Sequence, residues 1–165
     1  MMMWIGPLAF QSIGVRGMAP DYSISGFPEY MTDIATLDPV QRREVSRAAR
    51  EIVASLRTKM PVRGILVVGN ADVALRKAIG ERAQFELDVS QTRAASGRKV
   101  LLDEIAASSG NPSARYFFKV RVLGMGSSNR KIVNPVTEAQ MKQNRRVEYY
   151  LFRESLGSAS CGCEG

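Results

Sequence analysis

The stretch MKQNRRVEYYLF, residues 141–152, carries the clearest indication of the fold. After the adjacent pair Arg145 and Arg146, apolar residues occupy alternate positions: Val147, Tyr149, Leu151. This period predicts a β-strand with one face buried. Neighbouring strand residues point to opposite faces, so only one of the two arginines can face a crevice at the end of the sheet. We expect Arg145 to support a site there and Arg146 to be a packing or surface residue.

Two helices are predicted before this strand. Residues 37–59 contain an Asp-Pro pair that suits a helix start, followed by apolar residues at three- and four-residue spacing: Val45, Ala48, Ala49, Ile52, Val53, Leu56. Residues 73–87 are polar and are expected to form a loop. The second helix is expected over residues 88–110, with Asp88 or Ser90 as its cap.

Strands are predicted around these helices. Residues 65–68 form a continuous apolar run, typical of a strand buried on both faces, and residues 118–122 alternate like a half-buried strand. A short edge strand is expected within residues 21–27, and a short helical turn within residues 137–144. Strands that alternate with helices predict an α/β (α+β) sandwich, in which helices cover one face of a sheet.

A single domain is expected over residues 21–154, preceded by a flexible arm, residues 1–20. Residues 155–165 are interpreted as a disordered tail. Cys161 and Cys163 in this tail are too close in sequence for an unstrained bridge, and crosslinking between chains is the alternative role. The first residues are apolar but lack a positive segment and a clear cleavage site, so we do not expect them to act as a signal peptide. No membrane span is expected, because no apolar stretch is long enough.

Composition argues against several classes of function. The chain has no histidine, the commonest general base and metal ligand, and two cysteines alone cannot form a zinc site. No glycine-rich phosphate loop follows a strand. The formal charge of +7 favours an anionic partner, but no basic stripe with interleaved aromatic residues indicates nucleic-acid binding. We therefore expect a non-enzyme without metal or cofactor, and no nucleic-acid partner.

Asp72 and Arg93 are the best candidates for a binding site. Asp72 follows the apolar run, and Arg93 falls in the first turn of the expected second helix. Ligands of α/β layers favour the crevice outside the strand ends, where an aspartate can hold an ammonium group and an arginine can bind a carboxylate with two hydrogen bonds. A helix N-terminus would add backbone donors for the same anion. The pair fits a zwitterionic amino-acid group; in the alternative reading, Asp72 caps a turn and Arg93 is solvated.

Four segments together resemble a known family: ILVVGNAD (65–72), VSQTRAASGRKVL (89–101), VLGMGSSN (122–129), NRRVEYYL (144–151). They are similar to the OmpA-like domain, the peptidoglycan-binding module of outer-membrane, Pal-type lipoprotein and flagellar-stator (MotB-type) proteins. Asp72 matches the family's aspartate, Arg93 its helix arginine, and residues 144–148 its N-R-R-V-E motif. The resemblance spans residues 37–152, most of the chain.

The resemblance implies a βαβαββ-type mixed sheet and non-catalytic binding of the diaminopimelate residue of the peptidoglycan stem peptide. The residues expected to bind it are Asn70, Ala71, Asp72, Val89, Ser90, Arg93 and Arg145. Periplasmic or cell-envelope localisation is implied, with peptidoglycan as the expected partner and other envelope proteins as further candidate partners.

Some positions depart from the family pattern. Asn70 and Ala71 replace its His-Thr pair, Glu86 replaces an asparagine, and the segment after Asp72 is longer than usual. These departures leave a second hypothesis open, in which the domain has lost peptidoglycan binding and serves as a protein-interaction module.

Overall fold

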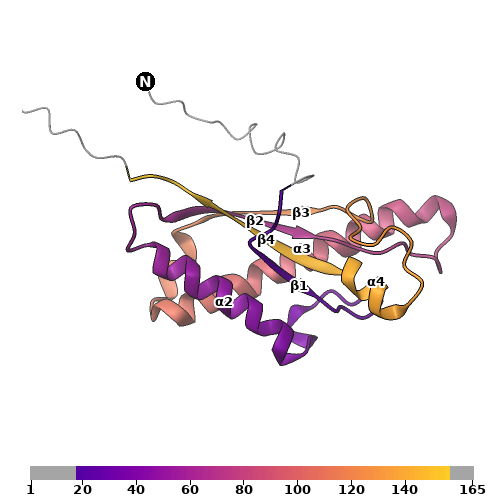
Figure 1. Cartoon of the computed structure of the whole chain (residues 1–165), viewed down its shortest axis with the longest axis horizontal. Coiled ribbons are helices and arrows are strands. Elements are labelled where there is room, and N and C mark those ends of the chain that lie inside the picture. Colours follow the sequence, from indigo (N-terminus) through magenta and orange to yellow (C-terminus); the bar gives the residue numbers. More distant parts are fainter. Residues whose placement is uncertain (1–17, 157–165) are drawn as a thin grey trace, which may run out of the picture.

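A four-stranded mixed sheet forms the frame of the protein (Figure 1). The computed structural model describes residues 18–156, so the expectations for residues 1–17, for Cys161 and for Cys163 lie outside the described residues. In chain order the elements are β1 (Tyr22–Ser25), the short 3-10 helix η1 (Ile34–Thr36), α2 (Pro39–Ser55), β2 (Val62–Gly69), α3 (Ile79–Ser109), a second 3-10 helix η2 (Pro112–Tyr116), β3 (Lys119–Gly124), α4 (Glu138–Asn144) and β4 (Arg146–Arg153).

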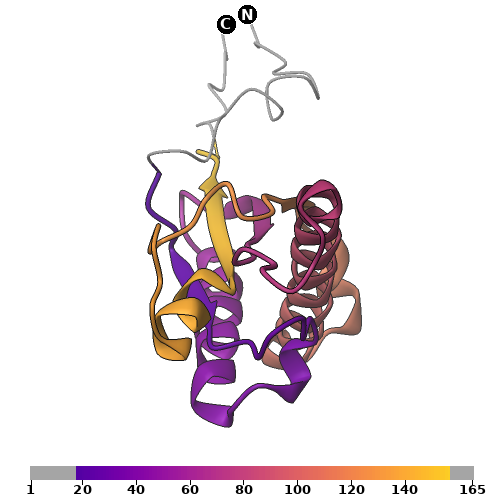
Figure 2. The same ribbon diagram turned by 90° about the vertical axis from the view of Figure 1, so that its right-hand side faces the viewer.

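The strands lie in the order β1-β4-β2-β3. β2 and β3 are parallel, whereas β4 is antiparallel to both of its neighbours. α2 and α3 lie side by side on one face of the sheet (Figures 1 and 2). Val147 and Tyr149 of β4 are fully buried in the core on this face, as their alternation predicts. The predicted α/β sandwich with helices on one face is confirmed. No helix in the described part of the chain is long and apolar enough to cross a membrane.

The start of α3 differs from the prediction. α3 begins at Ile79, so residues 79–87, expected to be a loop, are helical. This first part of the helix extends beyond the sheet (right in Figure 1), and most of its side chains are exposed. It has no apolar stripe for that reason, and its N-cap Ala78 makes no side-chain hydrogen bond. Arg93 therefore lies in the middle of α3, and no helix N-terminus lies beside it.

α3 approaches the sheet closely at the carboxyl ends of β2 and β3. A Cβ atom on Gly69 would lie 1.8 Å from the carbonyl oxygen of Ser90, and one on Gly124 would lie 2.7 Å from the backbone nitrogen of Gln91. The Gln91 side chain also accepts a hydrogen bond from the Gly124 N–H at 2.7 Å. Because Arg93 is one turn beyond Ser90, this contact places its side chain over the end of β2.

Replacing Gly69 by alanine should lower the free energy of unfolding by about 1–3 kcal/mol, because the clashing atom belongs to the backbone of α3 and cannot rotate away. Gly80→Ala is the matched control. Nothing lies within 4 Å of a Cβ added at Gly80, so this change should be neutral or stabilise the helix by up to about 1 kcal/mol. Urea unfolding measures both variants, and equal stabilities would show that α3 can shift from the sheet without cost.

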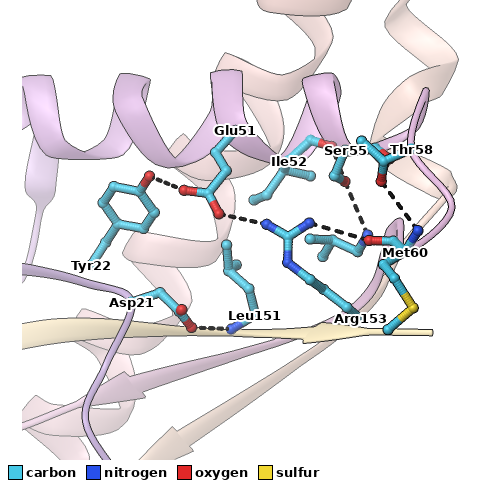
Figure 3. A network of polar contacts seen from close by, with 10 residues as sticks. Asp21, Tyr22, Glu51, Ile52, Ser55, Thr58, Met60, Leu151 and Arg153 are labelled. Carbon is cyan, nitrogen blue, oxygen red and sulfur yellow. Dashed lines mark hydrogen bonds and ion pairs between the residues drawn. The ribbon is translucent and has the colours of Figure 1, made fainter. Parts of the chain in front are cut away.

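At the other end of the sheet, a polar network joins α2 to β1 and β4 (Figure 3). Glu51 of α2 accepts hydrogen bonds from the Tyr22 hydroxyl and, at 2.6 Å, from Arg153 Nη2. Burial and the contact with Glu51 raise the pKa of Tyr22 to about 12. Arg153 Nη1 also donates to the Met60 carbonyl at 3.2 Å. The network holds the carboxyl end of β4. The candidate site described below lies at the opposite end of this strand, near Arg146.

Candidate functional site

A pocket lies where the carboxyl end of β2 meets the start of β4, at the end of the sheet next to α4. About 280 Å³ of space not filled by protein atoms lies in the pocket and its open mouth together. Its walls come from the segment after β1, the segment after β2, α3 and the entry to β4. They consist of Glu29, Tyr30, Ala71, Asp72, Val73, Ala74, Phe85, Glu86, Val89, Arg93 and Arg145.

Asp72 is half-buried at the pocket wall. Its Oδ1 accepts a hydrogen bond from the Asn144 side chain at 3.1 Å. Asn144 is itself fixed, because its amide group exchanges hydrogen bonds of 2.7 and 2.8 Å with the Ile132 backbone. Within residues 18–156, Asp72 has no ion pair, and its Oδ2 accepts no hydrogen bond. The carboxylate is thus held from one side with one oxygen free for a cation.

Arg93 is a buried cation, with 1% of its surface exposed. Its Nε donates to the Met31 carbonyl at 2.8 Å, its Nη1 donates to the Asn70 carbonyl at 3.0 Å, and its guanidinium lies 5.1 Å from the centre of the Phe27 ring. No carboxylate among the described residues forms an ion pair with it. Burial and the nearby charge of Arg145 lower the pKa of Arg93 to about 9. A buried charge is normally paired with an opposite charge, whereas the partners of Arg93 in the described chain are two backbone carbonyls and an aromatic ring.

The adjacent arginines have different partners, and only one of them lines the pocket. Arg145 lines the pocket, is 5% exposed, and contacts both carboxylate oxygens of Glu138, at 2.6 and 3.3 Å. That contact lowers the pKa of Glu138. Arg146 lies outside the pocket lining and forms a buried ion pair with Glu148 at 2.7 Å. Arg145 therefore adds positive potential to the pocket but already has its own counter-ion.

No family model matches the chain, and no curated protein matches it. Solved structures do match its fold. The peptidoglycan-associated lipoprotein from Burkholderia pseudomallei aligns with a TM-score of 0.53 and 20% identity, over 81% of this chain and 90% of the lipoprotein chain. The C-terminal domain of Helicobacter pylori MotB aligns with a TM-score of 0.52 and 20% identity, over 84% of this chain and 89% of that domain.

The chain has the OmpA-like fold. Within it, five of the seven residues expected at the site line the pocket: Ala71, Asp72, Val89, Arg93, Arg145. The side chains of Asn70 and Ser90 do not. The Asn70 side chain is fully buried and bonds to Glu148 and Asn129, at 3.3 and 3.1 Å. Ser90 Oγ donates to the Leu87 carbonyl at 2.8 Å. Both side chains thus make structural hydrogen bonds next to the pocket and do not line it.

The departures from the OmpA-like pattern have local structural explanations. Most of the long segment after Asp72 is helical, because α3 begins as early as Ile79. The carboxylate of Glu86 lines the pocket, yet its oxygens accept hydrogen bonds from the Ala74 backbone N–H at 2.7 Å and from the Ser127 hydroxyl. These two bonds occupy both oxygens and hold the segment after β2 against α3. Glu86 thus serves as a structural tie in this OmpA-like fold.

Sequence reasoning missed Tyr30, which enters the pocket from the segment after β1. Its backbone adopts a left-handed conformation, with φ of 61°. Its ring packs edge-on against Phe85 at 5.0 Å, and its hydroxyl is buried without a hydrogen-bond partner in the described part of the chain. Burial and the nearby Glu29 carboxylate raise the pKa of Tyr30. No period or motif marks an irregular segment, so only the folded structure identifies this hydroxyl.

Proposed function

We propose that the protein binds peptidoglycan without catalysis, through the zwitterionic end of a diaminopimelate residue. The carboxylate of that centre binds Arg93, and its ammonium group binds Asp72. The observation that carries the proposal is Arg93, a buried cation with no carboxylate partner in the described chain, in a pocket that also contains the free oxygen of Asp72. An anionic ligand supplies the missing counter-charge, and the neighbouring aspartate selects one that also carries an amine.

The similarity in fold supports this proposal. One structure with this fold belongs to a peptidoglycan-associated lipoprotein, and others are periplasmic domains of MotB. We accordingly place the protein in the periplasm or cell envelope, with peptidoglycan as partner and without enzymatic activity. A protein-interaction module that has lost the ligand is the second candidate, because Glu29 and Glu86 add two carboxylates to the pocket wall.

Retention on purified sacculi of the diaminopimelate type tests the function. The wild-type protein should stay bound when salt is raised from about 0.1 to about 0.5 M, because a buried clamp is screened less than surface charge. Asp72→Asn, which keeps the size of the side chain, should lose most of this retention. Release of the wild-type protein by salt would indicate generic attraction to its charge of +7. Absence of binding at both salt concentrations would favour the interaction module.

Tyr30→Phe should weaken binding of the diaminopimelate centre about two- to tenfold without destabilising the fold. The substitution removes only a buried hydroxyl that lacks a partner in the described chain, so the free protein loses no such hydrogen bond. Tyr149→Phe is the matched control. Its hydroxyl donates to the Gly97 carbonyl at 2.9 Å, so its loss should reduce stability by about 1 kcal/mol and leave affinity unchanged. Calorimetric titration measures the affinity of both variants, and thermal melting measures their stability. Unchanged affinity in Tyr30→Phe would show that this hydroxyl does not contact the ligand.

A further inference from the structure

A second depression, here called the apolar groove, lies on the other side of Asp72 from the pocket. Its walls are Asp72, Val73, Leu75, Val133, Val136 and Met141, together with Arg130, Asn134 and Pro135, and it encloses about 700 Å³ of largely open space. The walls come from the segment after β2, the segment between β3 and α4, and α4 itself. Its lining is thus contributed by segments that are far apart in the sequence.

The groove exposes apolar side chains where a soluble surface would normally be polar. Leu75, Val133 and Val136 are 65%, 63% and 81% exposed. The guanidinium group of Arg130 donates to the Val133 carbonyl at 2.7 Å, which holds that valine in place. Large apolar side chains gathered in one concave site indicate contact with another molecule. The apolar part of these walls binds methyl groups and hydrocarbon, and the lining has no aromatic surface on which a sugar could stack.

The groove is continuous with the proposed binding pocket. Asp72 and Val73 line both. A ligand that places its ammonium group on Asp72 therefore lies at the edge of the groove. The part of a longer ligand that extends out of the pocket past Asp72 therefore meets the apolar surface of the groove directly beside the clamp.

We propose that the apolar groove binds the peptide attached to the clamped residue, and that it recognises a small apolar side chain of the alanine type. This inference rests on the proposed function, since it extends the same site from one amino-acid centre to a peptide. In an uncrosslinked stem peptide the residue joined to the carboxyl side of diaminopimelate is an alanine, whose methyl group matches these walls. The charged clamp then sets the position of the ligand, and the groove distinguishes a peptide from a free amino acid.

Calorimetric titration with two probes tests the inference: free meso-diaminopimelate, and the tetrapeptide in which diaminopimelate is followed by D-alanine. Burial of one methyl group strengthens binding about fourfold, so the wild-type protein should bind the tetrapeptide at least that much more tightly than the free amino acid. The double variant Val133→Ser, Val136→Ser should bind both probes equally, with its affinity for free diaminopimelate unchanged. Val40→Ser, at a position 60% exposed on α2, is the matched control and should keep the wild-type ratio.

Equal affinities of the wild-type protein for the two probes would overturn the groove while leaving the clamp intact. The inference would also fall if the double variant weakened both probes to the same extent, because the valines would then act through the shape of the pocket. If wild-type self-association were lost in the double variant while the tetrapeptide still bound as tightly, the groove would be a contact between two copies of the chain. Absence of binding of either probe to the wild-type protein would refute the proposed function, and the groove inference with it.

Discussion

Replacing Arg93 by alanine should abolish measurable binding of the diaminopimelate centre and lower the free energy of unfolding by about 2–5 kcal/mol. The side chain is 1% exposed, stacks on Phe27 and satisfies the carbonyl groups of Met31 and Asn70. Alanine would leave a cavity and two carbonyl groups without this donor. In the first turn of a helix, as the sequence predicted for Arg93, an arginine would contribute little to packing and its loss would leave the fold intact. The buried position in the middle of α3 predicts a loss of stability instead.

One effect opposes this loss of stability. The pKa of Arg93 falls from its ordinary, higher value to about 9 in the folded protein. Between these two values the unfolded chain binds more protons, so the stability of the free protein rises with pH over that window. Below about pH 9 the full cost of burying the charge is present. Alanine removes that cost at neutral pH, and a bound carboxylate would offset it in the wild-type protein.

Arg93→Lys separates binding from folding. Lysine keeps the charge and much of the stem but cannot form two parallel hydrogen bonds with a carboxylate, so affinity should fall at least tenfold while a cooperative melt remains. Arg98→Ala, at an exposed position on the same helix, should alter neither affinity nor stability by more than about 0.5 kcal/mol. Titration and urea unfolding of these variants are the measurements. A lysine variant that binds like the wild-type protein would contradict two-point recognition of the carboxylate.

Peptidoglycan of the diaminopimelate type should bind about ten- to a hundredfold more tightly than the lysine type. A lysine side chain has an ammonium group that can donate to Asp72, but it lacks the carboxylate that would bind Arg93. Arg93 has no carboxylate partner among the described residues, so such a ligand would leave it buried and uncompensated. Losing one charge-assisted interaction costs about 1.5–3 kcal/mol, which corresponds to this range.

Titration with matched muropeptides of the two types measures the preference directly. Free diaminopimelate should compete with the first type, whereas free lysine should not. Asp72→Asn should weaken binding of the diaminopimelate type without creating a preference for lysine, because the amide keeps the hydrogen-bonding shape but loses the charge. Equal affinities for both muropeptides would refute the zwitterion clamp, and the absence of heat from either would favour the protein-interaction module.

Patterns with a strong period predicted the frame of the fold correctly. The alternation after Arg146 located β4 and its buried face, and the helical period over residues 37–59 located α2. The predicted start of α3 was wrong. The first two turns of the helix extend past the sheet, so they pack against no core and have no apolar stripe. Burial against the sheet creates the period that sequence analysis detects, so a helix end without a packing partner has no such period.

The sequence by itself determined the class of fold and five of the eleven residues that line the pocket, because residues such as Asp72, Arg93 and Arg145 occur in motifs tied to regular elements. Only the tertiary structure decided the state of those residues. Arg93 is buried, without an ion pair among residues 18–156, because α3 lies against Gly69 and because the segment after β1 covers its side chain with Met31 and Phe27. That segment also brings in the Tyr30 hydroxyl, which has no hydrogen-bond partner in the part of the chain that the structure describes. Charge and hydrogen-bonding state depend on which distant segments exclude water from a group, and no local pattern of residues records that contact.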